Sequence, residues 1–152
     1  MKRTLVAGMG NLLRGDDGFG VRVLERLAST TLPAGVELYE AGGAGVALAQ
    51  KLMDGYDACI LVDATERQGA PGTLYRLEPR ITAETTAPTE IGLHNLDPFK
   101  VLILARALNA LPADVLVIGC EPLQTEELCQ ELSPPVLAAV ERAVELILRE
   151  LS

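Results

Sequence analysis

The sequence predicts an α/β domain whose largely parallel sheet carries helices on both faces. Strand-like and helix-like segments alternate from one end of the chain to the other, without repeats or a linker. Short connections in a β-α-β-α-β order require right-handed crossovers and therefore parallel strands. Hydrophobic residues make up 49% of the sequence and aromatic residues only 3%, with no Trp, so the core has to be built from aliphatic side chains. Such a core is typical of strands that are buried on both faces.

Three apolar runs are predicted to form strands, residues 4–7, 59–63 and 115–119, and residues 36–39 (VELY) are predicted to form a further strand. The first run stops at Gly8, and the second, CILVD, is the most apolar in the chain and ends on a carboxylate. A fifth strand is expected over residues 73–77 (TLYRL), which a proline and a glycine set off from the preceding loop. Its alternating polarity is more typical of the edge of a sheet than of its centre.

Helices are predicted between these strands. After Asp17, apolar residues recur at helical spacing, at positions 21, 24 and 27. Three further helices are predicted: residues 46–53, 98–108 and 135–151. Ser133 precedes the last helix as an expected N-cap, with proline in the first turn.

The overall charge and the cysteines limit the partners and the compartment. The net charge is −8, and no cluster of Lys and Arg offsets it, so nucleic acid is not an expected partner. The three cysteines, Cys59, Cys120 and Cys129, are odd in number and form no CxxC pair, which indicates a reducing compartment. The first two lie in apolar runs, where a thiol packs as a small hydrophobe.

No targeting or membrane segment is predicted. The N-terminus lacks the ~7–15 consecutive apolar residues of a signal peptide. No stretch of the chain approaches the ~18 apolar residues of a membrane span. We expect a cytoplasmic protein, a single domain over residues 1–152, with no membrane insertion, and a monomer when free.

The first loop, GMGNLLRGDDGFG, is the first candidate for a site, because ligands of parallel sheets lie beyond the carboxyl ends of the strands. Gly8 and Gly10 resemble a dinucleotide-binding fingerprint, and Glu40 stands where such folds place a ribose-binding acid. Leu13 occupies the place of the third glycine, however, and Asp16 and Asp17 would compete with a phosphate at the helix N-terminus. A Rossmann-like nucleotide-binding module therefore stays open as an alternative.

Asp17, Asp63 and His94 are the candidate metal ligands. Helix capping explains one aspartate at the start of a helix, but not two in succession beside a glycine-rich turn. Asp63 ends the third strand, and His94 is the only histidine in the chain. His94 follows the one long loop, residues 78–93, which we expect to be mobile until a partner docks. Two carboxylates and one imidazole leave a metal site incomplete, so another molecule has to supply the missing ligands.

Several segments together resemble the maturation proteases of nickel–iron hydrogenases. They are VAGMGNLLRGDDGFGVRVLERL, EAGGAGVALAQKL, ILVDATERQGAPGTLYRL, the GLHNLD histidine, VIGCEP and LSPPVLAAVERAVELI, and they cover nearly the whole chain in the order of that family. The resemblance implies an α/β/α sandwich of three layers with five strands, the fourth of which is antiparallel. It also implies an endopeptidase that removes the C-terminal extension of a hydrogenase large-subunit precursor after nickel has been inserted.

The metal-binding positions of the family fall on Asp17, Asp63 and His94, so the resemblance implies that these residues read the nickel carried by the substrate. Zinc or cadmium supplied in vitro is expected to occupy the same site. Two positions depart from the family pattern. Asp17 is often Glu in relatives, and the usual Asp-Gly-Thr after the second strand is replaced here by residues 40–43, EAGG. The resemblance does not separate cleavage from a checkpoint that binds the nickel-loaded precursor without cutting it.

Overall fold

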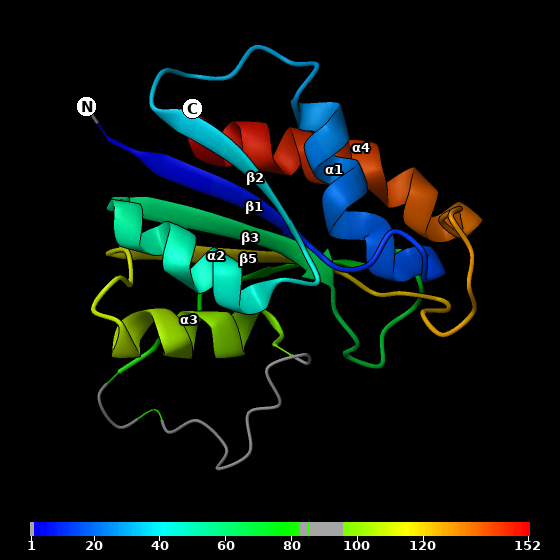
Figure 1. Cartoon of the computed structure of the whole chain (residues 1–152). Coiled ribbons are helices and arrows are strands. Elements are labelled where there is room, and N and C mark those ends of the chain that lie inside the picture. The colour runs from blue at the N-terminus through cyan, green and yellow to red at the C-terminus, as the bar shows by residue number, and fades with distance from the viewer. Residues whose placement is uncertain (1, 83–84, 86–95) are drawn as a thin grey trace.

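The computed structural model describes residues 2–82, 85 and 96–152 (Figure 1). The sheet has five strands, which are β1 (Thr4–Met9), β2 (Val36–Gly42), β3 (Ala58–Ala64), β4 (Leu74–Leu77) and β5 (Asp114–Cys120). Their order is β2-β1-β3-β5-β4. The first three pairs are parallel, whereas β4 runs antiparallel to β5 at the edge. This confirms the largely parallel sheet and the edge position of the strand predicted over residues 73–77.

Helices cover both faces of the sheet. They are α1 (Phe19–Leu27), α2 (Gly45–Lys51), α3 (Pro98–Ala107) and α4 (Pro134–Leu151), with short 3-10 turns at η1 (Gly15–Gly18) and η2 (Leu52–Asp54). The helices α1 and α4 lie on one side of the sheet, and α2 and α3 lie on the other (Figure 1). The three-layer α/β/α architecture is therefore confirmed.

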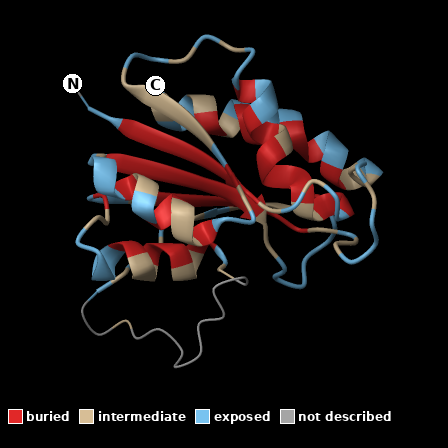
Figure 2. Cartoon of the chain, viewed as in Figure 1, coloured by how far each residue is buried: buried red, intermediate tan, exposed pale blue. Residues whose placement is uncertain are grey.

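The core consists of two apolar clusters, one on each face of the sheet. Alternate strand residues such as Val6 and Val62 pack against α1 and α4, while Leu5 and Leu61 pack against α2 and α3. Because both faces are covered, β1 is buried throughout its length and β3 is buried except at its last residue, Ala64 (Figure 2). This burial explains the continuous apolar runs, since no side of these strands meets water.

Several boundaries differ from the sequence prediction. Strand β1 does not stop at Gly8 but continues to Met9. The reason is strand pairing: Met9 still lies opposite Gly42 of β2, and the N–H of Gly10 donates to the oxygen of Gly42 at 2.8 Å. The helix predicted from Asp17 begins at Phe19, because Asp17 lies in the preceding 3-10 turn.

The cysteines behave as predicted. All three thiols are free, and Cys59 and Cys120 are buried in the two apolar clusters. Burial raises the pKa of both thiols to about 12, so they are inert thiols at neutral pH. In the part of the chain that the structure describes, no helix combines the length and the apolar character that crossing a membrane requires.

Candidate functional site

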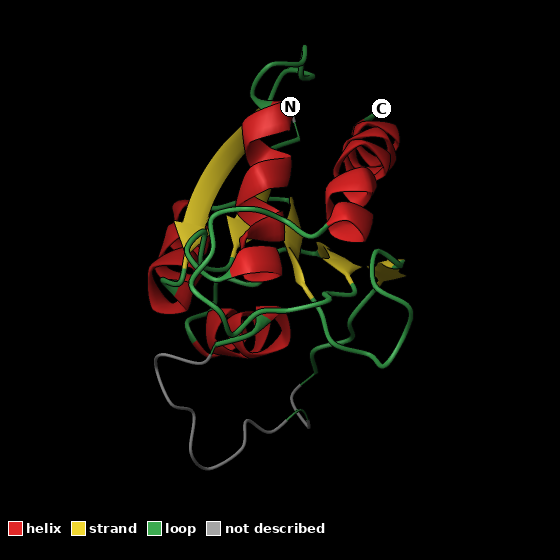
Figure 3. Cartoon of the chain, turned by 90° about the vertical axis from the view of Figure 1, so that its right-hand side faces the viewer, coloured by secondary structure: helices red, strands yellow, loops and turns green. Residues whose placement is uncertain are grey.

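Three loops meet at the carboxyl ends of the parallel strands. They follow β1 (residues 10–18), β3 (residues 65–73) and β5 (residues 121–133). Figure 3 looks onto this edge of the sheet, where the loops lie in front of the strands. Because the carboxyl ends of β1, β3 and β5 are neighbours, side chains from sequence positions far apart come together here.

Asp17 and Asp63 both lie close to Gly10. A Cβ at Gly10 would lie 1.8 Å from the backbone oxygen of Asp17 and 3.3 Å from Oδ1 of Asp63. Gly10 also has a φ of +109°, which side chains rarely tolerate. Its lack of a side chain therefore lets the two aspartates approach each other at this loop.

Each of these two carboxylates uses one oxygen for a local hydrogen bond. The backbone N–H of Asn11 donates to Oδ2 of Asp17 at 2.8 Å, and the N–H of Ala64 donates to Oδ1 of Asp63 at 2.8 Å. Among the described residues, neither carboxylate forms an ion pair, and the second oxygen of each accepts no hydrogen bond. These two oxygens are donors of the kind that a divalent cation accepts, so the pair fits a partial metal site.

The surroundings of Asp63 disfavour its charged form. Its carboxyl is buried and lies near the charge of Asp17; burial and then this charge raise its pKa well above the ordinary value, against the effect of the Ala64 hydrogen bond. A smaller contribution in the same direction comes from Asp97. A cation between Asp17 and Asp63 would reverse this balance and favour the carboxylate.

Asp97 is a residue that the sequence prediction missed. It is the N-cap of α3, where its side chain accepts a hydrogen bond from the N–H of Lys100 at 2.9 Å, and Pro98 follows at the first helical position. The sequence signal was present, since Asp before Pro at a helix start is a common cap. What the sequence could not show is that this end of α3 lies near Asp63.

Asp16 has a structural role that neither capping nor metal binding describes. Its side chain is fully buried, and it accepts hydrogen bonds from the N–H groups of Leu123 and Gln124 at 2.8 and 3.1 Å. It also accepts from the N–H and the hydroxyl of Ser133 at 2.7 and 2.8 Å. Asp16 therefore fastens the loop of residues 121–133 to η1.

The prediction that Ser133 caps α4 is corrected in part. Ser133 does occupy the N-cap position, but its hydroxyl accepts no capping hydrogen bond from the helix. The hydroxyl instead donates to the buried carboxylate of Asp16 at 2.8 Å.

Glu121 holds the loop after β3 in place by hydrogen bonds, as Asp16 holds the loop after β5. It is buried and accepts from the N–H groups of Arg67 and Gly69 at 2.8 and 2.9 Å, and from the Tyr75 hydroxyl at 2.6 Å. Burial alone would raise its pKa, but these hydrogen bonds outweigh burial and lower it. Sequence reasoning gave Glu121 no role.

His94 and most of the loop predicted over residues 78–93 lie outside the described residues. The structure therefore places Asp17 and Asp63 together and leaves His94 untested. Within the described ranges, no group of three or more His, Cys, Asp and Glu side chains is arranged to hold a metal ion.

The glycines that resembled a nucleotide fingerprint serve another purpose. Gly10 leaves room for Asp17 and Asp63. Asp17 lies in η1, directly before α1, where a pyrophosphate would have to bind. Glu40 is exposed on β2. The geometry therefore gives no support to the nucleotide-binding alternative.

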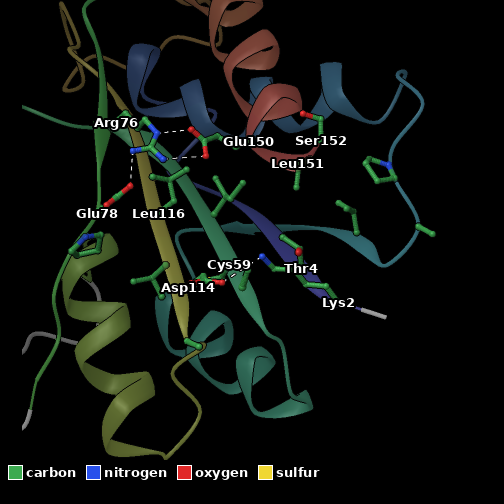
Figure 4. Close-up of a pocket in the computed structure, with 18 of the residues that line it drawn as sticks. Lys2, Thr4, Cys59, Arg76, Glu78, Asp114, Leu116, Glu150, Leu151 and Ser152 are labelled. Carbon is green, nitrogen blue, oxygen red and sulfur yellow. Dashed lines mark hydrogen bonds and ion pairs between the residues drawn. The ribbon is translucent and has the colours of Figure 1, made fainter.

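A cavity of about 580 Å³ lies at the opposite edge of the sheet, near the amino ends of β1, β3 and β5 (Figure 4). Most of its charged side chains are paired with each other: Arg76 donates to Glu78 and Glu150, and Lys2 to Asp114. The cavity thus offers largely neutralised charges and no aspartate pair like that at the carboxyl edge.

Comparisons with known proteins agree on one family. The model of the HycI hydrogenase maturation protease family matches residues 21–150. The chain is 34% identical to the hydrogenase expression/formation protein HupD of Rhodobacter capsulatus, over 99% of this chain and 71% of that protein. It is also 34% identical to a putative hydrogenase maturation protease of Methanocaldococcus jannaschii, over 99% of this chain and 97% of that protein.

Solved structures give the same result. The hydrogenase 2 maturation peptidase of a Thaumarchaeota archaeon is 37% identical, with a TM-score of 0.75, over 99% of this chain and 98% of that one. The hydrogenase maturating endopeptidase HybD of Escherichia coli is 32% identical, with a TM-score of 0.79, over 98% and 91% of the two chains. The chain belongs to the hydrogenase maturation protease family and is an endopeptidase of hydrogenase maturation.

Proposed function

We propose that the protein removes the C-terminal extension of a hydrogenase large-subunit precursor and recognises the nickel that this precursor carries. The observation that supports this proposal is the aspartate pair beside Gly10. Asp17 and Asp63 each present one carboxylate oxygen that no described residue engages, at the edge where three loops meet. Family membership makes cleavage the better reading than the checkpoint that binds without cutting.

The two carboxylates and His94 would read the nickel as part of the substrate. Three protein ligands leave a divalent metal under-coordinated, and the precursor's own ligands would complete its sphere. Borderline metals bind weakly to a site with two oxygen donors and one imidazole, so the free protein is expected to hold nickel, zinc or cadmium only loosely. Specificity for the loaded precursor then follows, because neither molecule alone makes the complete site.

Asp63 would hold one side of the metal, and a cation there would favour its charged carboxylate. Asp17 holds the other side of the metal and is kept in place by the Asn11 N–H. The nickel supplies Lewis-acid polarisation of a carbonyl group when it is present.

The test is to incubate the protein with nickel-loaded and nickel-free precursor and to measure the mass of each product. We expect the mass of the extension to be lost only from the loaded precursor. Loss from both precursors would contradict nickel recognition and leave the protease activity standing. Retention of the extension in both would contradict the proposed substrate.

A further inference from the structure

Three leucines are strongly exposed on the two loops that flank η1. Leu13 is 52% exposed, Leu123 59% and Leu128 84%. Leu13 lies in the loop after β1, and the other two lie in the loop after β5, which runs beside it (Figures 1 and 3). Single exposed leucines are common, but several on adjoining loops at a candidate site are a feature of interaction surfaces. We call these three residues the leucine platform.

The backbone of the platform is fixed by hydrogen bonds. The N–H of Cys129 donates to the oxygen of Leu13 at 2.9 Å, and the N–H of Gly15 donates to the oxygen of Cys129 at 2.7 Å, which forms a short parallel bridge. The N–H of Leu123 donates to the buried Asp16 carboxylate at 2.8 Å. The leucines are therefore presented to water on an ordered backbone, and less conformational entropy is lost when a partner covers them.

The platform is continuous with the candidate site. Asp16, which holds Leu123, is the neighbour of Asp17 in η1. The loop that carries Leu123 and Leu128 follows β5, whose residues Gly119 and Cys120 pair with Asp63 and Ala64. The leucines and the two aspartates therefore belong to loops at the same edge of the sheet.

The charges around the platform indicate the kind of surface that fits it. Glu126, Glu127 and Glu131 are exposed on the same loop, and Arg14 is the exposed cation beside them. The complementary surface is an apolar patch bordered by Lys and Arg side chains, since opposite charges around an apolar centre favour encounter and register.

We propose that the leucine platform is the docking surface for the folded body of the hydrogenase large-subunit precursor, through an apolar patch of the precursor bordered by basic side chains. This proposal rests on the proposed function, because it takes the precursor as the substrate. The precursor would then contact the protein at two places, the metal and the leucine platform. The platform contact acts on binding of the precursor and not on the chemical step.

The experiment compares a double variant, Leu123→Ser with Leu128→Ser, with the control Met53→Ser. Met53 is 58% exposed, so the control also removes exposed apolar surface, although from one side chain instead of two, and it lies in η2, which precedes β3 and is therefore at the opposite edge of the sheet. Processing of nickel-loaded precursor is followed by mass at several precursor concentrations. We expect KM to rise about tenfold or more in the double variant, with kcat within about twofold of wild type. The control should match wild type in both constants.

Charge reversal gives a second variant that does not depend on the leucines. Glu126→Lys with Glu127→Lys should raise KM as well, and this increase should shrink at high salt because the added repulsion is screened. All variants are checked by their thermal midpoint, which should stay within a few degrees of wild type, since each altered side chain is exposed.

The outcomes distinguish failure of the docking proposal from failure of the proposed function. If wild type cleaves the loaded precursor and the double variant has an unchanged KM, the platform is wrong and the proposed function stands. A fall in kcat without a change in KM, or an equal effect of Met53→Ser, also overturns the platform. If wild type does not cleave the loaded precursor at all, both proposals fail.

Discussion

Three carboxylates at the amino edge of the sheet and three at the carboxyl edge have different kinds of partner. At the amino edge, Glu37 is paired with Lys51 at 2.8 Å, Asp114 with Lys2 at 3.4 Å, and Glu150 with Arg76. At the carboxyl edge, Asp16, Asp17 and Asp63 form no ion pair with any described residue and are held by N–H and hydroxyl donors. The three amino-edge carboxylates are neutralised by Lys or Arg side chains, whereas Asp16, Asp17 and Asp63 have no cationic partner among the described residues.

The difference also appears in the pKa values. The hydrogen bond from Lys51 and then that from Tyr56 lower the pKa of Glu37, and the hydrogen bond from Arg76 lowers that of Glu150. Burial and the charge of Asp17 raise the pKa of Asp63. Folding thus stabilises the charged forms of Glu37 and Glu150 and the neutral form of Asp63, and a carboxyl group held in its less favourable state is expected where function competes with stability.

The largest expected effect is on processing. Asp17→Ala and Asp63→Ala should each lower processing of nickel-loaded precursor by at least about a hundredfold, because each removes a proposed ligand of the substrate metal. Asp114→Ala, which removes a carboxylate from the amino edge, should leave processing at the wild-type rate. Processing is measured by mass and folding by the thermal midpoint.

Stability separates this loss of function from unfolding. Removal of one of two neighbouring carboxylates relieves repulsion, so the free energy of unfolding should change by at most ~2 kcal/mol in either direction. Wild-type processing by either alanine variant would remove that residue from the proposed site.

The next effect is on stability and concerns Asp16. Asp16→Ala deprives Leu123, Gln124 and Ser133 of their common acceptor, so we expect a loss of about 2–5 kcal/mol in the free energy of unfolding. Asp16→Asn keeps acceptor oxygen and should lose less. Urea unfolding measures both. A loss below ~1 kcal/mol in the alanine variant would show that the loop of residues 121–133 does not depend on this carboxylate.

Metal binding by the free protein is expected to have a smaller effect. Zinc at about ten times its Kd should stabilise wild type by about 1.4 kcal/mol, since the gain is RT ln(1 + [L]/Kd) for a ligand that binds only the folded state. Asp63→Ala and His94→Ala should each abolish the rise in thermal midpoint, and Asp114→Ala should keep it. A full zinc response in His94→Ala would remove the histidine from the site.

Features set by interactions between residues close in the sequence could be predicted, and features set by distant residues could not. Hydrophobic periodicity is local, so the strands, their burial and the edge position of β4 were predictable, and the rule for parallel sheets brought Asp17 and Asp63 to one edge. The role of Asp16 was not predictable, because its partners lie 107 to 117 positions away along the chain. Local sequence predicted Ser133 as a helix cap, but its hydroxyl donates to the carboxylate of Asp16, which is distant along the chain.

The smallest effect is a pH dependence in which the two edges oppose each other. Asp63 has a raised pKa in the folded state, so its contribution to stability is fully present below the unfolded-state pKa of about 4 and is lost as pH rises through the folded-state value. Glu150 has a lowered pKa, so its contribution is present above that unfolded-state value and is lost as pH falls through the folded-state one.

The free energy of unfolding should be measured by urea at several pH values, with a chelator present, for wild type, Asp63→Asn and Glu150→Gln. As pH rises from about 4, wild type should lose stability relative to Asp63→Asn, by at most about 1.4 kcal/mol per pH unit. As pH rises through the acid range, wild type should gain stability relative to Glu150→Gln, because that variant lacks the carboxylate that pairs with Arg76. Parallel curves for wild type and Asp63→Asn would mean that Asp63 titrates alike in the folded and unfolded chains, and the contrast between the two edges would then not extend to their protonation.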